Sequence, residues 1–539
     1  MLRSWRFVAC TAALLVVAPA SVQADVRDWA RRHAVPLATV DLVADDADLE
    51  AVGRSIGAAP LVAFGESAHA THEFAQMRNR LFTFLVEKKG FRAIVIESGL
   101  IEGRLVERYI HGDPSVTLRT ALLEGFTHGM GPWEEVRALV DWMKAFNERQ
   151  RDEASKVHFY GMDLPQMGDA LITPLDALAP ALREVDPEYF HGPFQALLAL
   201  ARKANEVTER VGRSAGGPLD PDSLDGYASI GFDQLTGGEK AALSRGLGDL
   251  PRRIDAKAFA YRRATSLAEY RWTARLAVVA RQMLRDLTSR DTHRSIPGFD
   301  TNIEEVTRAY GASAQRCGTV PAPGAASRIR AGAVVINCDR LVDVRADRSF
   351  VRDVRDYLRG RETRERSLAE NVAWVKRVHR KALVFAHNGH VMKAGVEPTL
   401  DGRFIGSAGD QPMGRFLAKR FGRDFVAIGG TMDVFVAPES REALDTFSGA
   451  AVTPTAPCHD CLEGVYNQVA DDLGSDIFFL DMRTAAGADR DGLARAREHR
   501  WQGEFQRYGA GVPYDALVFI RRVRPASRIT SASGDARPR

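Results

Sequence analysis

Acidic residues and histidines follow several short apolar runs of the sequence at the point where each run ends. The run Leu61–Gly65 leads directly into Glu66 and His69. Three further runs end in the same way, and the polar residues that end or follow them are Glu97, Asp163, His387, Asn388 and His390. If the runs are parallel strands, these side chains meet at the sheet edge where open α/β sheets bind ligands. An imidazole beside a carboxylate is suited to proton transfer, so the pattern predicts an active site at this edge.

Each of these residues also has a purely structural interpretation. Glu66 and Asp163 are suited to capping a helix or a turn amide, and a lone His69 is more often a core or capping histidine. Glu97 ends an apolar run, where a carboxylate is rare without a partner or a purpose. The coincidence at four separate runs favours an active site over four unrelated structural roles.

Arg78 is expected on the apolar side of the helix that follows the first run. The apolar stripe of that helix consists of Phe74, Met77, Leu81, Phe82 and Leu85. At about 100° per residue, Arg78 falls roughly 40° from Phe74, inside this stripe. A buried arginine needs carboxylates or a ligand, so we expect Glu66 or Glu97 as its partner. The alternative is that Arg78 extends to solvent from the edge of the stripe.

The elements that position these residues are predicted from hydrophobic periodicity. Continuous apolar runs predict strands buried on both faces, at Leu61–Gly65, Ala93–Glu97, Val157–Gly161, Ala382–Ala386, Phe425–Gly429, Ile477–Leu480 and Ala516–Ile520. Amphipathic helices are expected between the early strands, around Phe74–Val86 and Trp133–Phe146. This alternation is typical of the α/β class, with a mostly parallel sheet flanked by helices.

The segment 166–295 breaks this alternation, because it holds no convincing strand and much helical pattern, at Pro193–Val211 and Ala256–Leu287. It is interpreted as a helical insertion. The whole chain is therefore divided into a signal peptide (1–24), a first part of the α/β hydrolase core (25–165), the insertion (166–295), an irregular disulfide-pinned excursion (296–345), the second part of the core (346–524) and a flexible tail (525–539).

The first 24 residues have the layout of a secretory signal peptide. Arg3 and Arg6 precede an apolar run that is shorter than the about 20 residues a membrane span needs, and small residues precede Asp25. Cleavage after Ala24 removes two arginines and no acid, which lowers the formal net charge from +3 to +1. We expect a periplasmic or secreted protein without stable membrane insertion. The near-neutral charge also makes nucleic acid an unlikely partner class.

Four cysteines remain after this cleavage, and an even count in an exported chain favours disulfides. Pairing neighbours in sequence gives Cys317–Cys338 and Cys458–Cys461, although four cysteines allow three connectivities. A redox pair or half a metal site is the alternative for Cys458 and Cys461. The loop composition before Cys458 favours the structural disulfide.

These residues resemble the motifs of the erythromycin esterase family, and the matching blocks run in order over about residues 55–525. The blocks are Gly65-Glu66-Ser67-Ala68-His69 with Thr71-His72-Glu73-Phe74 and Arg78, Gly90-Phe91-Arg92-Ala93 leading to Glu97, Trp133-Glu134-Glu135-Val136 with Trp142, Phe159-Tyr160-Gly161-Met162-Asp163, Arg364-Glu365 with Ala369-Glu370-Asn371, Ala386-His387-Asn388 with His390, and Gly422-Arg423-Asp424-Phe425-Val426-Ala427-Ile428-Gly429. The Gly-Glu-x-x-His and Ala-His-Asn-x-His blocks are specific in combination.

The resemblance implies a hydrolase in which a histidine activates water against an ester or lactone. His69 matches the general base of the family and Glu66 the acid beside it. Arg78, Glu97 and His387 match the residues that complete the catalytic site, and Arg78 or His387 is suited to stabilising the oxyanion. Substrate contacts are expected from His72, Asp163, Asn388 and His390. No cofactor is expected, the partner is a small-molecule ester or lactone, and neither the natural substrate nor the oligomeric state is predicted.

Three competing interpretations remain. A serine nucleophile would need an elbow between a strand and a helix, but the Gly-x-Ser-x-Gly match at 212–216 lies in a polar loop of the insertion, and His69 stands where Ser67 would need a glycine. A metal-dependent hydrolase would draw ligands from His69, His72, Glu97, His387 and His390. A non-catalytic envelope-binding protein would use the same cluster for recognition alone.

Overall fold

The computed structural model describes residues 19–529, apart from 43–44, 166–170, 215–231, 233–234, 295–332, 338–339, 344–347, 396–398, 401–402, 405–410, 437–460, 496–497, 502–503 and 508–510. Within these residues, eight strands form one mixed sheet in the order β1-β11-β14-β10-β2-β7-β3-β4. Its strands are β1 (Val35–Pro36), β2 (Leu61–Glu66), β3 (Ala93–Gly99), β4 (His158–Asp163), β7 (Ala382–His387), β10 (Phe425–Phe435), β11 (Ile477–Asp481) and β14 (Ala516–Val523).

The sheet is mostly parallel, as the sequence predicts. All pairs from β14 to β4 are parallel, whereas β11 pairs antiparallel with β14, and β1 pairs antiparallel with β11. Each of the seven predicted strands is present, and every residue of β2, β3 and β7 is buried. The short strand β1 is not predicted from the sequence, because two residues carry no periodicity.

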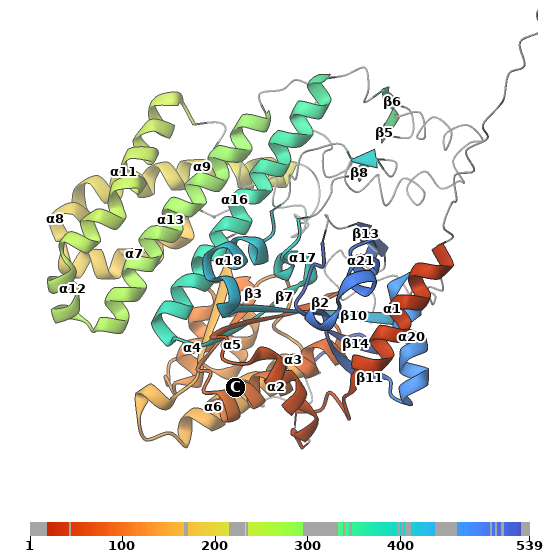
Figure 1. Ribbon diagram of the computed structural model, residues 1–539. Coiled ribbons are helices and arrows are strands. Elements are labelled where there is room, and N and C mark those ends of the chain that lie inside the picture. The colour runs from red at the N-terminus through yellow and green to blue at the C-terminus, as the bar shows by residue number, and fades with distance from the viewer. Residues whose placement is uncertain are drawn as a thin grey trace, which may run out of the picture.

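Helices cover both faces of the sheet, and successive strand residues alternate between two hydrophobic cores. Val62 and Phe64 of β2 belong to one core, Leu61 and Ala63 to the other. The first face is covered by α2 (Glu50–Ile56), α3 (His72–Lys89), α4 (Gly103–Ile110), α5 (Leu118–Glu124) and α6 (Glu134–Glu148). The second face is covered by α1 (Pro19–His33), α16 (Arg348–His379), α17 (Asn388–Val391), α18 (Met413–Phe421), α20 (Leu462–Leu473) and α21 (Gly487–Arg495). Figure 1 shows this three-layer arrangement.

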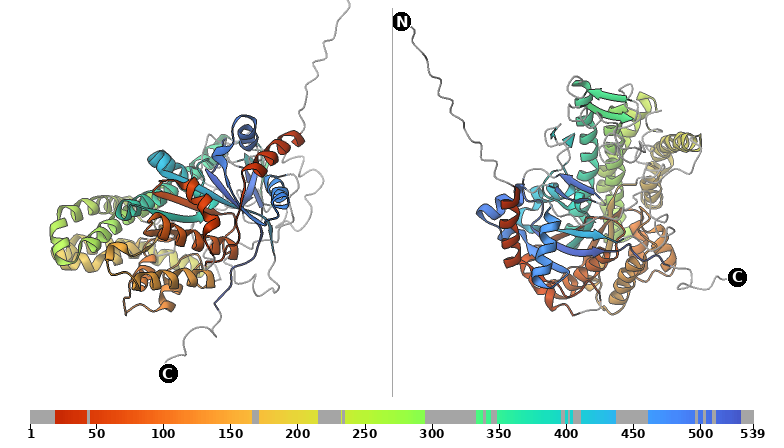
Figure 2. Two further views of the ribbon diagram at one scale, coloured as in Figure 1. Left: turned by 60° about the horizontal axis from the view of Figure 1, so that its bottom comes forward. Right: turned by 90° about the vertical axis from the view of Figure 1, so that its right-hand side faces the viewer.

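The predicted insertion is helical and has a hydrophobic core of its own. Its helices are α7 (Ile172–Val185), α8 (Pro187–Tyr189), α9 (Gln195–Ser214), α11 (Gly237–Ala256), α12 (Ala258–Ala264) and α13 (Leu267–Arg294). They stand together beyond one end of the sheet, and α16 runs from the sheet to lie along α13 (Figures 1 and 2). The stretch predicted as one helix around Ala256–Leu287 is split, because Ser266 caps a new helix by accepting a hydrogen bond from the Glu269 N–H at 3.1 Å.

Three short hairpins complete the described chain: β5 (Ala333–Asn337) with β6 (Arg340–Asp343), β8 (Thr399–Leu400) with β9 (Arg403–Phe404), and β12 (Glu498–Trp501) with β13 (Glu504–Arg507). The first lies inside the segment predicted to be irregular. Of the four cysteines, Cys317, Cys338 and Cys458 lie outside the described residues, so both disulfide pairings stay predictions.

The chain is ordered beyond the point where the sequence predicts a flexible tail. Residues 524–528, which we call the C-terminal segment, run alongside the loop between β2 and α3. Ala526 donates its N–H to the Ala70 carbonyl at 2.8 Å, and Arg524 accepts from the His72 N–H at 2.8 Å. The segment therefore satisfies backbone groups of another loop.

Candidate active site

Glu66 and His69 form a hydrogen-bonded pair at the carboxyl end of β2. Glu66 is the last residue of the strand, and its Oε1 lies 2.8 Å from His69 Nδ1. Glu66 is buried, whereas 27% of the His69 side chain is exposed. Burial opposes ionisation of Glu66 and raises its pKa, although the hydrogen bond with His69 offsets part of this effect. The pair therefore combines a buried carboxylate with an imidazole that solvent reaches.

The pKa of His69 is raised in turn. Burial works against the imidazolium, but the hydrogen bond that it donates to Glu66 and the negative charge of Glu97 outweigh this effect. The backbone of the loop is unusual directly after His69, since Ala70 has a φ of 49°, in the left-handed region that a residue with a Cβ rarely adopts. Such strain persists where surrounding contacts fix the chain, here through the C-terminal segment.

Glu97 and the β7–α17 turn lie next to this pair, because β7 is the neighbour of both β2 and β3. Glu66 and His387 are direct partners in the β2–β7 register. Glu97 Oε2 accepts the backbone N–H of His387 at 2.7 Å, and Glu97 Oε1 lies 2.9 Å from His390 Nε2. Burial disfavours the charged form of Glu97, but the charge of His390 outweighs this and holds the Glu97 pKa well below its ordinary range.

His390 lies between two buried carboxylates. Its Nδ1 is 2.6 Å from Glu365 Oε1 of α16, opposite the contact with Glu97. Burial lowers the pKa of His390, but the two carboxylates together raise it to about 10. His390 is therefore an imidazolium at neutral pH, and it neutralises part of the negative charge of this cluster.

His387 is held as a neutral imidazole in one tautomer. The Gly389 N–H donates to Nδ1 at 3.2 Å, so this nitrogen is unprotonated. Nε2 therefore carries the proton and donates it to the Ser67 carbonyl at 3.2 Å. Burial and the neighbouring charge of His69 keep the His387 pKa well below its ordinary value. The two histidine rings lie 5.0 Å apart, so His387 forms one wall beside His69.

Arg78 is buried as the helix stripe predicts, but its hydrogen bonds go to a residue that the sequence analysis did not consider. Its Nε and Nη2 donate to Asn79 Oδ1 at 2.9 and 2.8 Å, rather than to Glu66 or Glu97. The guanidinium also lies 4.9 Å from the centre of the Phe385 ring. Burial lowers the pKa of Arg78 to about 10 against the opposing charges of Glu66 and Glu135. Arg78 thus acts on Glu66 through its charge.

Asp163 and Asn388, predicted to contact substrate, make extensive contacts within the protein. Arg364 of α16 donates to both carboxylate oxygens of Asp163, at 3.1 and 2.5 Å. Burial disfavours the Asp163 anion, but Arg364 outweighs it and lowers the pKa. Asn388 donates to the Gly430 carbonyl at 2.7 Å and accepts its N–H at 3.2 Å, which ties α17 to β10.

His72 lies at the first turn of α3 and pairs with a carboxylate outside the predicted set. Its Nδ1 is 2.5 Å from Glu135 Oε1, and this hydrogen bond raises the His72 pKa. The same carboxylate accepts the Ser527 N–H at 3.0 Å. His72 therefore belongs to the junction between α3, α6 and the C-terminal segment.

Neither serine considered from the sequence has the environment of a nucleophile. Ser67 follows a strand, but its side chain is buried and its Oγ makes no hydrogen bond within the described part of the chain. Ser214 is the last residue of helix α9, so residues 212–214 of the Gly-x-Ser-x-Gly match lie inside a helix, whereas a nucleophile elbow follows a strand.

Several residues of the site have no role in the sequence prediction. Glu365 and Arg364 stand in the quoted motif Arg364-Glu365, but nothing in a 32-residue helix tells which residues face the strand ends.

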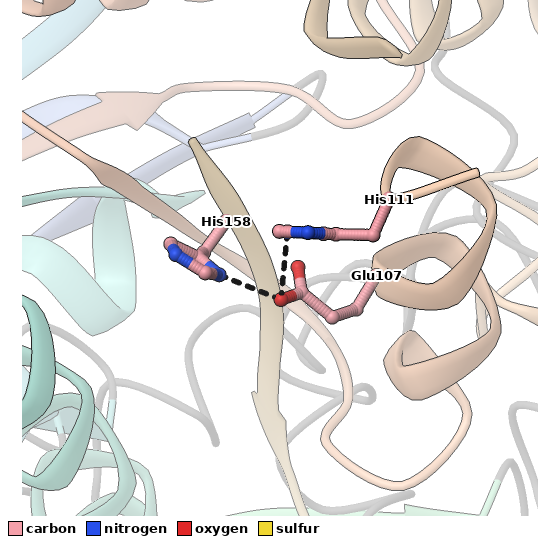
Figure 3. Close-up of side chains that lie close together, drawn as sticks. All are labelled: Glu107, His111 and His158. Carbon is pink, nitrogen blue, oxygen red and sulfur yellow. Dashed lines mark hydrogen bonds and ion pairs between the residues drawn. The ribbon is translucent and has the colours of Figure 1, made fainter. Parts of the chain in front are cut away.

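A second group of potential metal ligands, Glu107, His111 and His158, lies elsewhere in the described chain (Figure 3). Its signal is the Glu-x-x-x-His spacing of Glu107 and His111.

Known proteins resemble the chain in sequence and fold. The model of the family described as erythromycin esterase matches residues 86–523. An Escherichia coli erythromycin esterase type II is 24% identical over 211 residues, which are 39% of this chain and 45% of the relative. An Escherichia coli erythromycin esterase type I is 28% identical over 132 residues, or 24% and 30% of the two chains. The chain thus matches less than half the length of these curated relatives.

Solved structures extend the likeness to the whole fold. A mutant of the erythromycin esterase EreC in its open conformation has a TM-score of 0.56 at 18% identity, covering 90% of this chain and 96% of that one. A Bacillus cereus protein gives 0.58 at 18% identity, covering 94% and 99%. A succinoglycan biosynthesis protein gives 0.59 at 17% identity, covering 95% and 99%. These likenesses extend over the α/β core and the insertion, and with the family match they show that the chain belongs to the erythromycin esterase family.

Proposed function

We propose that this chain is a hydrolase that cleaves a carboxylic ester or lactone with water activated by His69. The observation that carries the proposal is the Glu66–His69 pair, in which a buried carboxylate holds a partly exposed imidazole at 2.8 Å. A general base needs this orientation together with access to water. Membership of the erythromycin esterase family supports the same reaction class.

The proposed reaction begins with neutral His69. Its Nε2 takes a proton from water while the water oxygen attacks the carbonyl carbon, and the carbonyl oxygen becomes an oxyanion. Glu66 stabilises the imidazolium that forms. When the tetrahedral intermediate collapses, the bond to the leaving oxygen breaks and the imidazolium returns the proton to that oxygen. The products are a carboxylic acid and an alcohol, which are parts of one molecule when the substrate is a lactone.

The other charged residues hold this pair in position. Glu97 fixes the backbone of His387, and the His390 imidazolium keeps Glu97 ionised between β3 and α17. Arg78 supplies positive charge near Glu66, which favours the carboxylate form of Glu66 that orients His69. We assign His69 and Glu66 to the chemistry and Glu97, His387 and His390 to positioning.

The test is a screen of esters and lactones with purified protein, followed by the variant His69→Ala on an accepted substrate. We expect kcat to fall by about 10²- to 10⁴-fold, because the general base is removed. His191→Ala is the matched control, since His191 is exposed on the insertion. Full hydrolysis by a folded His69→Ala protein would overturn the mechanism. Activity before and after treatment with a chelator separates this mechanism from a metal-assisted one.

We also propose that the chain is exported after cleavage behind Ala24. Two features support this proposal: the basic and apolar layout of residues 1–24, and the even number of cysteines that follow. No helix in the described part of the chain has the length and apolar character of a membrane span. Expression in a Gram-negative host, fractionation and N-terminal sequencing test the proposal. An uncleaved chain confined to the cytoplasm would contradict it.

A further inference from the structure

Glu107, His111 and His158 converge at the edge of the sheet opposite the candidate active site. His158 begins β4, whereas Asp163 ends the same strand at the edge where Glu66 and His69 lie. Five steps of about 3.3 Å along the strand separate His158 from Asp163 by about 17 Å. Glu107 belongs to α4 and His111 caps that helix, so their i, i+4 spacing places both on one side of it. Figure 3 shows the three side chains pointing toward one another.

The donor atoms of this group are close enough to share one ion. One ligand atom from each residue lies within 4.8 Å of the others. Glu107 Oε1 is 2.7 Å from His158 Nδ1 and 3.2 Å from His111 Nε2. In a tetrahedral zinc site, two ligand atoms at the usual zinc–nitrogen distance are about 3.3 Å apart from each other. The donor atoms of this group are already near that separation, so small side-chain movements suffice to admit an ion.

The outer contacts orient two of the three ligands. His111 Nδ1 lies 3.0 Å from Glu153 Oε1, which leaves Nε2 as the nitrogen that faces Glu107. Metal-binding histidines commonly use their second nitrogen in this way. The Phe159 N–H donates to Glu107 Oε2 at 2.7 Å and so turns Oε1 toward the histidines. His111 Nε2 is buried and makes no hydrogen bond of suitable geometry among the described residues.

An ion can reach this group from solvent. The side chains of His111 and His158 are 19% and 18% exposed, and Glu153 is 67% exposed. Two imidazoles and one carboxylate form a ligand set that is found in zinc sites with three protein ligands and one water. Nitrogen donors favour zinc and related transition metals over magnesium or calcium.

We propose that Glu107, His111 and His158 bind one divalent ion of the zinc class, with water as a fourth ligand. The ion fastens the end of α4 to the beginning of β4. It lies at the far edge from His69 and takes no part in the ester chemistry, so the site is distinct from a metal-assisted active site.

The test uses the full chain, stripped of metal with a chelator and dialysed. Zn²⁺ is titrated in competition with a chromogenic chelator at neutral pH. We expect one tight equivalent for the wild type, and the same for His191→Ala and His69→Ala. His111→Ala should bind at least tenfold more weakly. Circular dichroism and thermal unfolding without metal establish that each variant is folded.

Glu153→Gln provides a second variant on an exposed side chain, where misfolding is no concern. Removing this outer carboxylate should weaken zinc binding by about 10- to 100-fold. Co²⁺ gives an independent signal, because a site with few ligands yields visible absorption bands that His111→Ala should abolish. The proposal fails if wild-type protein takes up no zinc, or if His111→Ala binds it as tightly as the wild type. In either case the three residues form only an ion-paired cluster.

Discussion

Glu66 of β2 and Glu97 of β3 are both buried glutamates of the same sheet. Their pKa values nevertheless shift in opposite directions. Burial raises the pKa of Glu66, whose main partner is the imidazole of His69. The His390 imidazolium, which is charged at neutral pH, outweighs burial at Glu97 and holds that pKa low. The two pKa shifts agree with the proposed roles, in which Glu66 pairs with the general base and Glu97 positions the neighbouring turn.

The pH dependence of hydrolysis follows from the raised pKa of His69. His69 must be neutral to accept a proton, so kcat/KM should rise with pH through a midpoint above 6.5. Glu66→Gln removes the anion that raises this pKa. The midpoint should then move to lower pH, and the maximal rate should fall by at least about tenfold.

The control for this measurement is Glu124→Gln, which makes the same change on an exposed side chain of α5. It should leave both the midpoint and the maximal rate unchanged. A Glu66→Gln profile with the wild-type midpoint would show that Glu66 does not act on His69.

Residue types at the strand ends are visible in the sequence, but their partners are not. The clustering of Glu66, His69, Glu97, His387 and His390 follows from apolar runs that end in polar residues, together with the parallel order of the strands. Asn79 as the partner of Arg78 depends on a side-chain rotamer, which no spacing rule specifies. Glu365 contacts His390 from helix α16, and no spacing rule tells which residues of that helix face the strand ends, so only the packed structure reveals that His390 has a second carboxylate.

At the scale of elements, the loop between β2 and α3 depends on the C-terminal segment. Ala70 adopts a left-handed conformation directly after His69, and its carbonyl accepts the Ala526 N–H. Glu135 receives the Ser527 N–H and also pairs with His72. The segment thus supports the loop on both sides of its bend. The sequence predicts a flexible tail here because polar and small residues near a terminus carry no apolar periodicity.

Ala526→Pro tests this support, because proline has no N–H to donate to Ala70. We expect the loop to loosen and kcat to fall by about ten- to a hundredfold, since small displacements of a catalytic group are costly. Ala526→Gly keeps the N–H and should retain most of the activity. Equal activity of the two variants would mean that the hydrogen bond does not position His69.

The strands themselves are predictable for a simple reason. Helices cover both faces of the sheet, so β2, β3 and β7 each begin with a continuous apolar run that stands out from its surroundings. The covering helices are less predictable, since α16 is polar along much of its length and contacts both the sheet and the insertion.

At the scale of the whole molecule, the cluster of Glu97, His390 and Glu365 links pH to the stability of the fold. The pKa of His390 is raised from an ordinary 6.5 to about 10. A raised pKa stabilises the folded state fully below the unfolded pKa, and this stabilisation is lost as pH rises through the folded pKa. The contribution of His390 should therefore be complete below pH 6.5 and decline between pH 6.5 and 10.

His390→Asn isolates this contribution. Near neutral pH the variant should be less stable by on the order of 3–5 kcal/mol, because two buried carboxylates lose their counter-ion. The difference in the free energy of unfolding should narrow toward pH 10 when measured by denaturant titration. His191→Asn, on the exposed surface, should show no such trend. A constant difference across this range would contradict a charged His390.

The order of synthesis gives the C-terminal segment a further consequence. Arg524 of this segment donates a hydrogen bond to Glu73 of α3, which stands 451 positions earlier in the sequence. A ribosome therefore completes β2, β3, β7 and their acids long before it makes the residues that support the Ala70 bend. A nascent chain carries every proposed catalytic side chain and still lacks the geometry to use them. Hydrolytic activity should consequently arise late, after residues 524–528 have left the ribosomal tunnel.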